Sequence, residues 1–268
     1  MSNRREFLMK NASTAALASA AVLTESSHLA AQEKPAPAPP YIELVTFRLH
    51  FGSQMDRLLS WLEKRVVTIL QKHQLGPMGI FTVDVGPHVP GVVFMLSYPS
   101  LAAFEAVVAK LGADQEWTTA YAELEAEGPP FFRQDFSLLR ALPFSPPLKA
   151  TTASEPVHKI YELRVYEAST FRQLDFMHQR FHSGEIEVFH QCGIHPSLYA
   201  DTFFGPNLPN MVYMIPFESE AHREKAWTAF RAHPDWKAIA AEWMKKSGEL
   251  ARNISSSILV PTSFSMIR

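Results

Sequence analysis

From residue 41 onward, hydrophobic positions follow two different periods that alternate along the chain. Stretches rich in β-branched and aromatic residues predict short strands, and stretches with apolar residues every three or four positions predict amphipathic helices. The predicted order, strand, helix, two hairpin strands, helix and strand, occurs twice. In the first half these elements fall at 41–49, 55–73, 79–85, 92–98, 101–126 and 136–142, and in the second half at 160–167, 171–189, 197–204, 211–217, 220–253 and 255–260.

The two halves are related by a constant offset of 119 positions. Glu43-Leu44 falls on Glu162-Leu163, Gly86-Pro87 falls on Gly205-Pro206, and Trp117 falls on Trp236. One offset kept over this length indicates two copies of one unit. We expect the copies to span residues 41–142 and 160–268, joined by a linker at 143–159 that contains Pro146-Pro147.

The predicted order βαββαβ is that of the ferredoxin-like split unit, which places the chain in the α+β class. A single unit leaves one face and both edges of its sheet uncovered. Two units can bury these by pairing their sheets face to face or edge to edge around a shared barrel. We therefore expect tandem ferredoxin-like units that form a pseudo-dimer.

The first residues differ from the rest of the chain. A pair of arginines in Asn3-Arg4-Arg5-Glu6-Phe7-Leu8 precedes a weakly apolar, Ala-rich stretch and the small residues Ala30-Ala31. This pattern predicts a twin-arginine signal peptide at 1–31, followed by a Pro-rich linker at 32–40, and export to the periplasm or beyond. The alternative, an amphipathic first helix, would require an apolar stripe that the segment lacks.

Composition narrows the classes of partner. The chain of 268 residues has a formal net charge of −2, so no basic field is available to bind nucleic acid. The uncharged run from Val85 to Phe104 contains three prolines and two glycines, so we expect no membrane span after signal cleavage. The single cysteine, Cys192, excludes a disulfide within one chain. Homo-oligomerisation stays open.

Several motifs of the second copy resemble the NIPSNAP family of the dimeric α/β-barrel superfamily. They are Tyr161-Glu-Leu-Arg164-Val-Tyr166, Cys192-Gly193-Ile-His195-Pro196, Asn210-Met-Val-Tyr213-Met and Ala221-His-Arg223-Glu-Lys-Ala-Trp227. The first copy is more degenerate, with Val45, Gly91 and Phe104 where the second has Arg164, Asn210 and Arg223. The resemblance implies a tandem barrel that binds a ligand. The superfamily includes cofactor-free monooxygenases and haem-handling enzymes.

Alternation along the strand at 160–167 puts Glu162, Arg164 and Tyr166 on one face. We expect the other face, which is apolar, to pack on the helices, so that the polar face lines the barrel lumen. The alternative is a structural Glu162–Arg164 ion pair on a solvent-facing sheet. Together with the resemblance, this gives the following candidate ligand-binding residues: Glu162, Arg164, Tyr166, His195, Tyr199, Asn210 and Arg223.

Other residues have simpler interpretations. Ser219 is a predicted N-cap for the helix that carries Arg223, and Arg223 itself is equally explained as a solvated arginine. Trp236 is interpreted as a core residue. His178 and His182 lie four residues apart on one helix, but the HExxH pattern is absent and no metal site is assigned.

No nucleophile elbow, phosphate loop or dinucleotide fingerprint occurs in the sequence. The leading hypothesis is therefore an exported protein that binds a small, partly apolar ligand in a barrel cavity, with no catalytic residue and no cofactor assigned. A cofactor-free or haem-dependent monooxygenase-like oxidoreductase and a protein-interaction module without a ligand are the alternatives.

Overall fold

The structure, a computed structural model, describes residues 40–87, 89–152 and 160–268. The predicted signal peptide, nearly all of the Pro-rich linker and residues 153–159 of the linker between the copies lie outside the described residues. Within the described ranges, no helix is both long enough and apolar enough to cross a membrane.

Each half of the chain forms the predicted set of strands and helices. The first repeat consists of β1 (Tyr41–Arg48), α2 (Gln54–Trp61), η1 (Leu62–Val66), α3 (Val67–Lys72), β2 (Met78–Val85), β3 (Gly91–Tyr98), α4 (Leu101–Gly112), α5 (Gln115–Glu125) and β4 (Arg133–Ala141). The second consists of β5 (Ile160–Glu167), α6 (Phe171–Arg180), η2 (Phe181–Glu185), α7 (Ile186–Gln191), β6 (Leu198–Phe204), β7 (Asn210–Phe217), α8 (Glu220–Ala232), α9 (Pro234–Ser247) and β8 (Asn253–Pro261).

The helices are more divided than the sequence pattern predicts. A π-helical turn interrupts the first helix of each repeat, at η1 and at the equivalent η2. The second helical stretch is two helices in each repeat, because α4 ends at Gly112 and α9 begins at Pro234, residue types that commonly end and start helices.

The strands close into one antiparallel barrel in the order β1-β3-β2-β8-β5-β7-β6-β4, with β4 paired to β1. Each repeat contributes four neighbouring strands. The two sheets meet edge to edge, where β2 pairs with β8 and β4 pairs with β6. The pairing leaves no free sheet edge among these strands, which confirms the predicted α+β class of tandem ferredoxin-like units.

Apolar side chains fill the barrel interior. Side chains at alternate positions of the strands point into the barrel. Those from the two sheets pack against one another there. They include Ile42, Leu44, Phe81, Val93, Met95, Leu139, Tyr161, Leu163, Leu198, Val212, Met214 and Leu259. The ring of Phe81 from the first repeat meets the ring of Tyr161 from the second, with centroids 5.2 Å apart.

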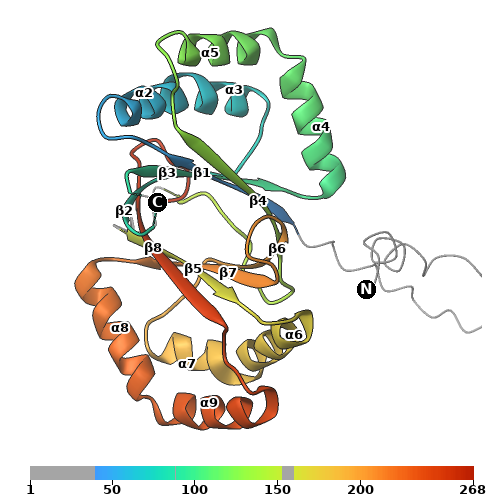
Figure 1. Ribbon diagram of the computed structural model, residues 1–268, viewed down its shortest axis with the longest axis vertical. Helices are drawn as coiled ribbons and strands as arrows, with labels where there is room; N and C mark the ends of the chain where they lie inside the picture. The colour runs from blue at the N-terminus through green and yellow to red at the C-terminus, as the bar shows by residue number, and fades with distance from the viewer. Residues whose placement is uncertain (1–39, 88, 153–159) are drawn as a thin grey trace, which may run out of the picture. The chain divides into compact units, whose positions relative to one another are not determined.

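The helices of each repeat cover the outer face of their own sheet, so that the barrel lies between two helical layers (Figure 1). Each layer has its own hydrophobic cluster. One joins α2, α3 and α5 to β1, β2 and β3, and the other joins α6, α7 and α8 to β5 and β7. Both faces of the central strands β1, β3, β5 and β7 are therefore largely buried, whereas the first residues of β4 and β8 are exposed.

Candidate functional site

The polar face of β5 lies on the opposite side from the one predicted. Tyr161 and Leu163 point into the barrel, whereas Glu162 and Tyr166 point towards the helices of the second repeat. The prediction that Glu162, Arg164 and Tyr166 line the lumen is wrong. Its premise, that the more apolar face packs on helices, fails because the barrel interior is itself a packed apolar core.

Glu162 is the centre of a buried hydrogen-bond network between β5, β8 and α8. Nη1 of Arg164 donates to its Oε1 at 2.5 Å, and Nε of Arg223 donates to its Oε2 at 2.8 Å. The indole Nε1 of Trp227 and the hydroxyl of Ser256 donate to the same carboxylate at 2.6 and 2.7 Å. The side chain is 0% exposed. Every lone pair of the carboxylate is engaged, so the network holds the sheet to α8.

This environment sets the protonation of Glu162. Burial by itself would raise the pKa of the carboxyl group, but the donors from Arg223, Arg164, Ser256 and Trp227 outweigh burial and hold the pKa below its ordinary value. Glu162 is therefore an anion that two guanidinium groups neutralise, as expected for a structural ion pair.

Of the other residues predicted for the site, Tyr166 and Tyr199 lie near this network, and His195 and Asn210 do not belong to it. The Tyr166 hydroxyl accepts from Nη2 of Arg164 at 3.2 Å. Tyr199 is buried and stacks on Tyr213 with centroids 5.8 Å apart. Asn210, at the start of β7, accepts from the Thr202 hydroxyl at 2.7 Å, and its amide donates to the preceding hairpin loop. His195 is exposed and stacks on His190.

In the described part of the chain, the histidines are not grouped around a metal site, and the surroundings of Cys192 disfavour its thiolate. His178 contacts Asp201 at 2.8 Å and not His182, and the described part of the chain holds no group of three or more His, Cys, Asp or Glu side chains arranged for a metal ion. Burial raises the pKa of the Cys192 thiol, which disfavours the reactive thiolate.

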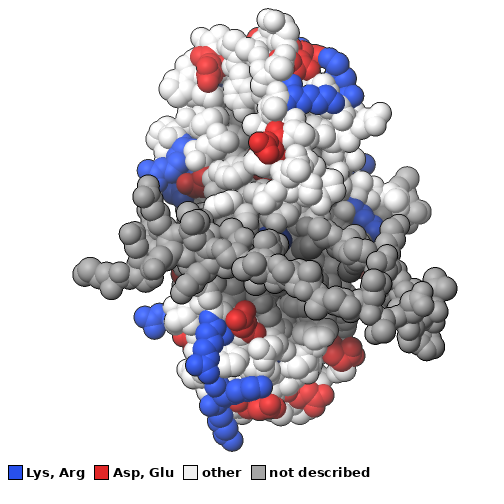
Figure 2. Space-filling view, turned by 90° about the vertical axis from the view of Figure 1, so that its right-hand side faces the viewer, with Lys and Arg blue, Asp and Glu red and all other residues white. Residues whose placement is uncertain are grey.

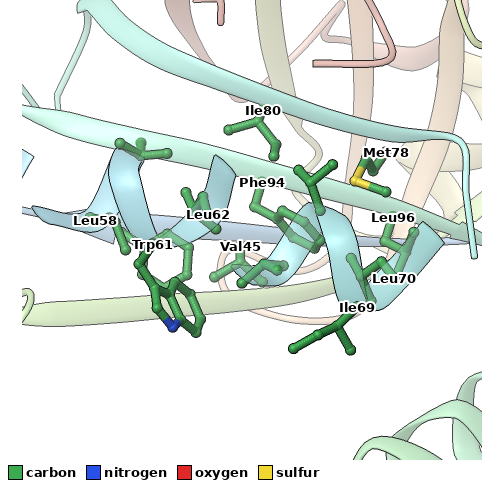
Figure 3. Close-up of a cluster of buried hydrophobic side chains, with 14 of the residues drawn as sticks. Val45, Leu58, Trp61, Leu62, Ile69, Leu70, Met78, Ile80, Phe94 and Leu96 are labelled. Atoms are coloured by element: carbon green, nitrogen blue, oxygen red, sulfur yellow. The ribbon is translucent and has the colours of Figure 1, made fainter. Parts of the chain in front are cut away.

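The first repeat has a cavity of about 320 Å³ between its sheet and its helices. Its walls come from β1, β3, β4, α2, η1, α3, α4 and α5 and are mostly hydrocarbon and aromatic. Figure 3 shows six of these side chains, Val45, Trp61, Leu62, Leu70, Phe94 and Leu96, within the buried cluster of this repeat. Val108 and Gly112 of α4 also line the cavity and are exposed, so it opens to solvent beside α4.

Two polar side chains meet inside this cavity. The Tyr98 hydroxyl of β3 donates to Oε2 of Glu43 in β1 at 2.6 Å. Burial raises the pKa of Glu43, and the Tyr98 hydrogen bond offsets this only in part. Burial also raises the pKa of Tyr98 well above its ordinary value, and the neighbouring Glu43 adds to the shift. Neither group is expected to ionise as readily as it would in water.

The second repeat fills the equivalent space with larger side chains. At the offset of 119, Leu62 and Leu70 correspond to Phe181 and Phe189, and Val108 corresponds to Trp227. Phe189 packs edge-on against Trp227 with centroids 5.6 Å apart, and Phe181 packs against Tyr213 at 5.7 Å. Of these two equivalent spaces, the one in the first repeat therefore has more room for a ligand.

Sequence reasoning missed Glu43 and Tyr98 because the second repeat carries the recognisable motifs. A signal was present, however. Glu43 is the only member of the polar set of β5 that the first repeat retains, and it stands among apolar replacements, Val45 for Arg164 and Phe104 for Arg223. A carboxylate kept after both of its cations are lost indicates a separate role.

The comparisons with known proteins agree with this fold. A monooxygenase-like protein from Fusobacterium nucleatum superposes with a TM-score of 0.54 at 9% identity, covering 84% of this chain and 93% of its own. Chlorite dismutase from Candidatus Nitrospira defluvii superposes with a TM-score of 0.50 at 8% identity, covering 87% and 94%. At these identities the likeness concerns the fold alone.

A NIPSNAP family protein of unknown function from Agrobacterium tumefaciens is 24% identical over 41% of this chain and 94% of its own, with a TM-score of 0.35. No curated protein has significant sequence similarity to the chain. The profile of the NIPSNAP family matches twice, over residues 42–146 and over residues 161–266. The chain therefore belongs to the NIPSNAP family and carries two tandem copies of its domain.

Proposed function

We propose that this protein binds a small, partly apolar molecule in the cavity of the first repeat, with Glu43 and Tyr98 as its polar contacts. The observation that carries the proposal is a difference between the two repeats. The space between the sheet and the helices is filled with side chains in the second repeat and open in the first. The volume of about 320 Å³ lies at the small end of the range for ligand sites.

Apolar walls with a few convergent polar groups are typical of sites for small molecules. Trp61 and Trp117 contribute indole rings, Tyr121 adds a phenol, and Phe94 closes the floor on the sheet. A planar molecule would therefore find ring faces on several sides. Glu43 and Tyr98 would fix its orientation, since they form a hydrogen-bonded polar pair on the sheet side of the cavity, where Gln134 of β4 is a further polar side chain.

Haem, one expectation from the resemblance, does not fit this cavity. None of the described residues that line it is His, Cys or Met. The two lining phenols, Tyr98 and Tyr121, have pKa values that burial raises, so neither readily gives the phenolate that would bind iron.

The test is a variant that copies the second repeat. Val108→Trp introduces the side chain that Trp227 supplies there, from a position that is 53% exposed and tolerant of size. Ala109→Trp is the matched control, because Ala109 is an exposed neighbour on α4 that does not line the cavity.

The protein is purified from its native host and examined by native mass spectrometry. We expect the wild type and Ala109→Trp to carry one additional small-molecule mass and Val108→Trp to lose it. Equal retention of that mass by Val108→Trp, or its absence from the wild type, would contradict the proposal.

A further inference from the structure

The internal repeat supplies a comparison that bears on the charge of the ligand. Glu43 and Glu162 occupy equivalent places, since Glu43 pairs with Leu96 across β1 and β3, and Glu162 pairs with Ile215, the equivalent of Leu96, across β5 and β7. Both carboxylates face the helices of their own repeat. The environment of Glu162 therefore shows what this position of the fold accommodates.

In the second repeat a guanidinium group lies against the carboxylate and against aromatic rings. Nη1 of Arg164 is 2.5 Å from Oε1 of Glu162. The same guanidinium carbon lies 4.5 Å from the ring centroid of Trp227 and 5.4 Å from that of Tyr166. Arg223 adds a second guanidinium to the carboxylate. The fold at this point thus holds a planar cation between an anion and π faces.

The first repeat keeps the anion and loses both cations. Val45 replaces Arg164, and Phe104 replaces Arg223. None of the described residues that line the cavity is Lys, Arg or His. Among the described residues, Tyr98 is the one hydrogen-bond partner of Glu43. Ionised Glu43 would be a largely buried carboxylate without a counter-charge, which is unfavourable.

Aromatic rings remain around the cavity. Trp61, Trp117 and Tyr121 lie on the helix side, and Phe47 and Phe94 lie on the sheet side. Ring faces attract cations, and the attraction grows when the cation is removed from water. An anion would meet Glu43 and no compensating charge. A neutral molecule would leave the charge of an ionised Glu43 uncompensated, whereas a cation would neutralise that charge.

Deepening the proposed function, on which this inference rests, we propose that the ligand is an organic cation, an ammonium or guanidinium group on a small apolar or aromatic body, which pairs with Glu43 in the place that the Arg164 guanidinium has in the second repeat. The side of the first repeat that carries α4 shows scattered side chains of both signs and no patch of a single sign (Figure 2). Selection would therefore depend on Glu43 itself.

The test uses three probes with one ring system, naphthalen-2-ylmethylammonium, naphthalen-2-ylmethanol and 2-naphthoate. At about pH 7 they are a cation, a neutral molecule and an anion. Binding is measured by calorimetry on the mature protein. We expect the ammonium to bind roughly tenfold or more tightly than the alcohol, as a charge-assisted hydrogen bond would give, and the naphthoate to bind weakest.

Glu43→Gln should remove the preference for the ammonium over the alcohol, because the charge that distinguishes the two probes is lost. Glu105→Gln is the matched control, because it removes one negative charge from an exposed position of α4 outside the cavity, and it should keep the preference.

A second variant, Phe104→Arg, supplies the cation that Arg223 gives to the second repeat. It should weaken ammonium binding and spare the alcohol.

Binding of the alcohol at least as tightly as the ammonium would overturn the cation assignment and leave the proposed ligand site intact. An unchanged ammonium preference in Glu43→Gln would also overturn it. Failure of all three probes to bind would count against the cation as well, whereas the native mass of the purified protein tests the ligand site independently.

Discussion

Glu43 and Glu162 are the same amino acid at equivalent positions, and their surroundings move their pKa values in opposite directions. Burial raises the pKa of Glu43, and the donors around Glu162 lower the pKa of that group. A native-state pKa above the unfolded value means that the folded protein binds protons more tightly, and a native-state pKa below it means the reverse. The two residues should therefore contribute to stability with opposite dependence on pH.

We expect Glu162→Gln to destabilise the protein by about 3 to 5 kcal/mol near pH 7, because it leaves Arg164 and Arg223 without their anion. The loss should shrink as the pH falls below about 4.3, the ordinary value for Glu, because the unfolded carboxyl group then binds a proton, and it should fall further until the pH passes the lower native pKa of Glu162. Glu43→Gln should match the wild type in acid and become more stable than it as the pH rises above that value. Urea unfolding across this range measures both differences. Profiles that slope in the same direction would contradict the assignment.

The residue pattern predicted part of this site and not its location. Alternation correctly put Glu162, Arg164 and Tyr166 on one face of a strand, because the side-chain period of two is a property of the backbone. The sequence pattern could not show which face of the strand packs on the helices. Hydrophobicity distinguishes a buried face from an exposed one, and both faces of this strand are buried. The ion pair of Glu162 with Arg164 was foreseen as an alternative, although on a solvent-facing sheet.

At the scale of the element, α8 determines how the second repeat is closed. Arg223 and Trp227 lie one turn apart on the same face of α8, and both donate to Glu162. In α4 the same two places hold Phe104 and Val108. These two positions of one helix thus contribute to the difference between a filled and an open repeat, together with Phe181 and Phe189, which stand where the first repeat has Leu62 and Leu70.

The start of α8 makes a testable contribution. The Ser219 hydroxyl accepts from the backbone N–H of His222 at 3.1 Å, which confirms the predicted N-cap. Ser219→Ala should lower the free energy of unfolding by about 1 kcal/mol, because a backbone donor of the first turn loses its partner. Ser219→Asp should keep most of the stability, and Glu218→Ala, at the exposed neighbouring residue, serves as the control. Equal stability of Ser219→Ala and wild type in urea would show that the cap contributes nothing.

The π-helical turns were not predictable from periodicity. A pattern with a period of 3.6 describes α2 and α6 well, but a π turn inserts one residue and then resumes the same period. The buried face therefore continues through the turn, from Leu58 and Leu62 to Val66 and Ile69. The turn occurs at equivalent positions of both repeats, at Leu62–Val66 and Phe181–Glu185, and in the second repeat Gly184 adopts a non-helical φ of 151° within it.

At the scale of the whole molecule, the barrel makes the two repeats depend on each other. β8, near the end of the chain, pairs with β2 of the first repeat, and β4 pairs with β6 of the second. The repeat offset predicted two copies of one unit. The need to cover the sheet edges predicted that the sheets of the two copies pair around a shared barrel. With a single cysteine, the fold is held by packing and strand pairing without an intrachain disulfide.

These features bear on how the protein reaches its compartment. The barrel closes only when strands from both ends of the described chain have been made, and it needs no oxidising environment. We propose that the chain folds in the cytoplasm and is then exported by the twin-arginine route, which carries folded proteins and reads the pair Arg4-Arg5.

Replacing that pair by Arg4→Lys with Arg5→Lys keeps the charge and removes the recognised group, so we expect uncut precursor to accumulate in the cytoplasm. Immunoblots of cytoplasmic and periplasmic fractions measure the ratio of precursor to mature protein. Lys10→Gln, a charge change outside the pair, should leave export unchanged. The proposal fails if the double variant is processed like the wild type, or if a host without the twin-arginine translocon still exports the protein, because the leader would then be read as an ordinary signal peptide.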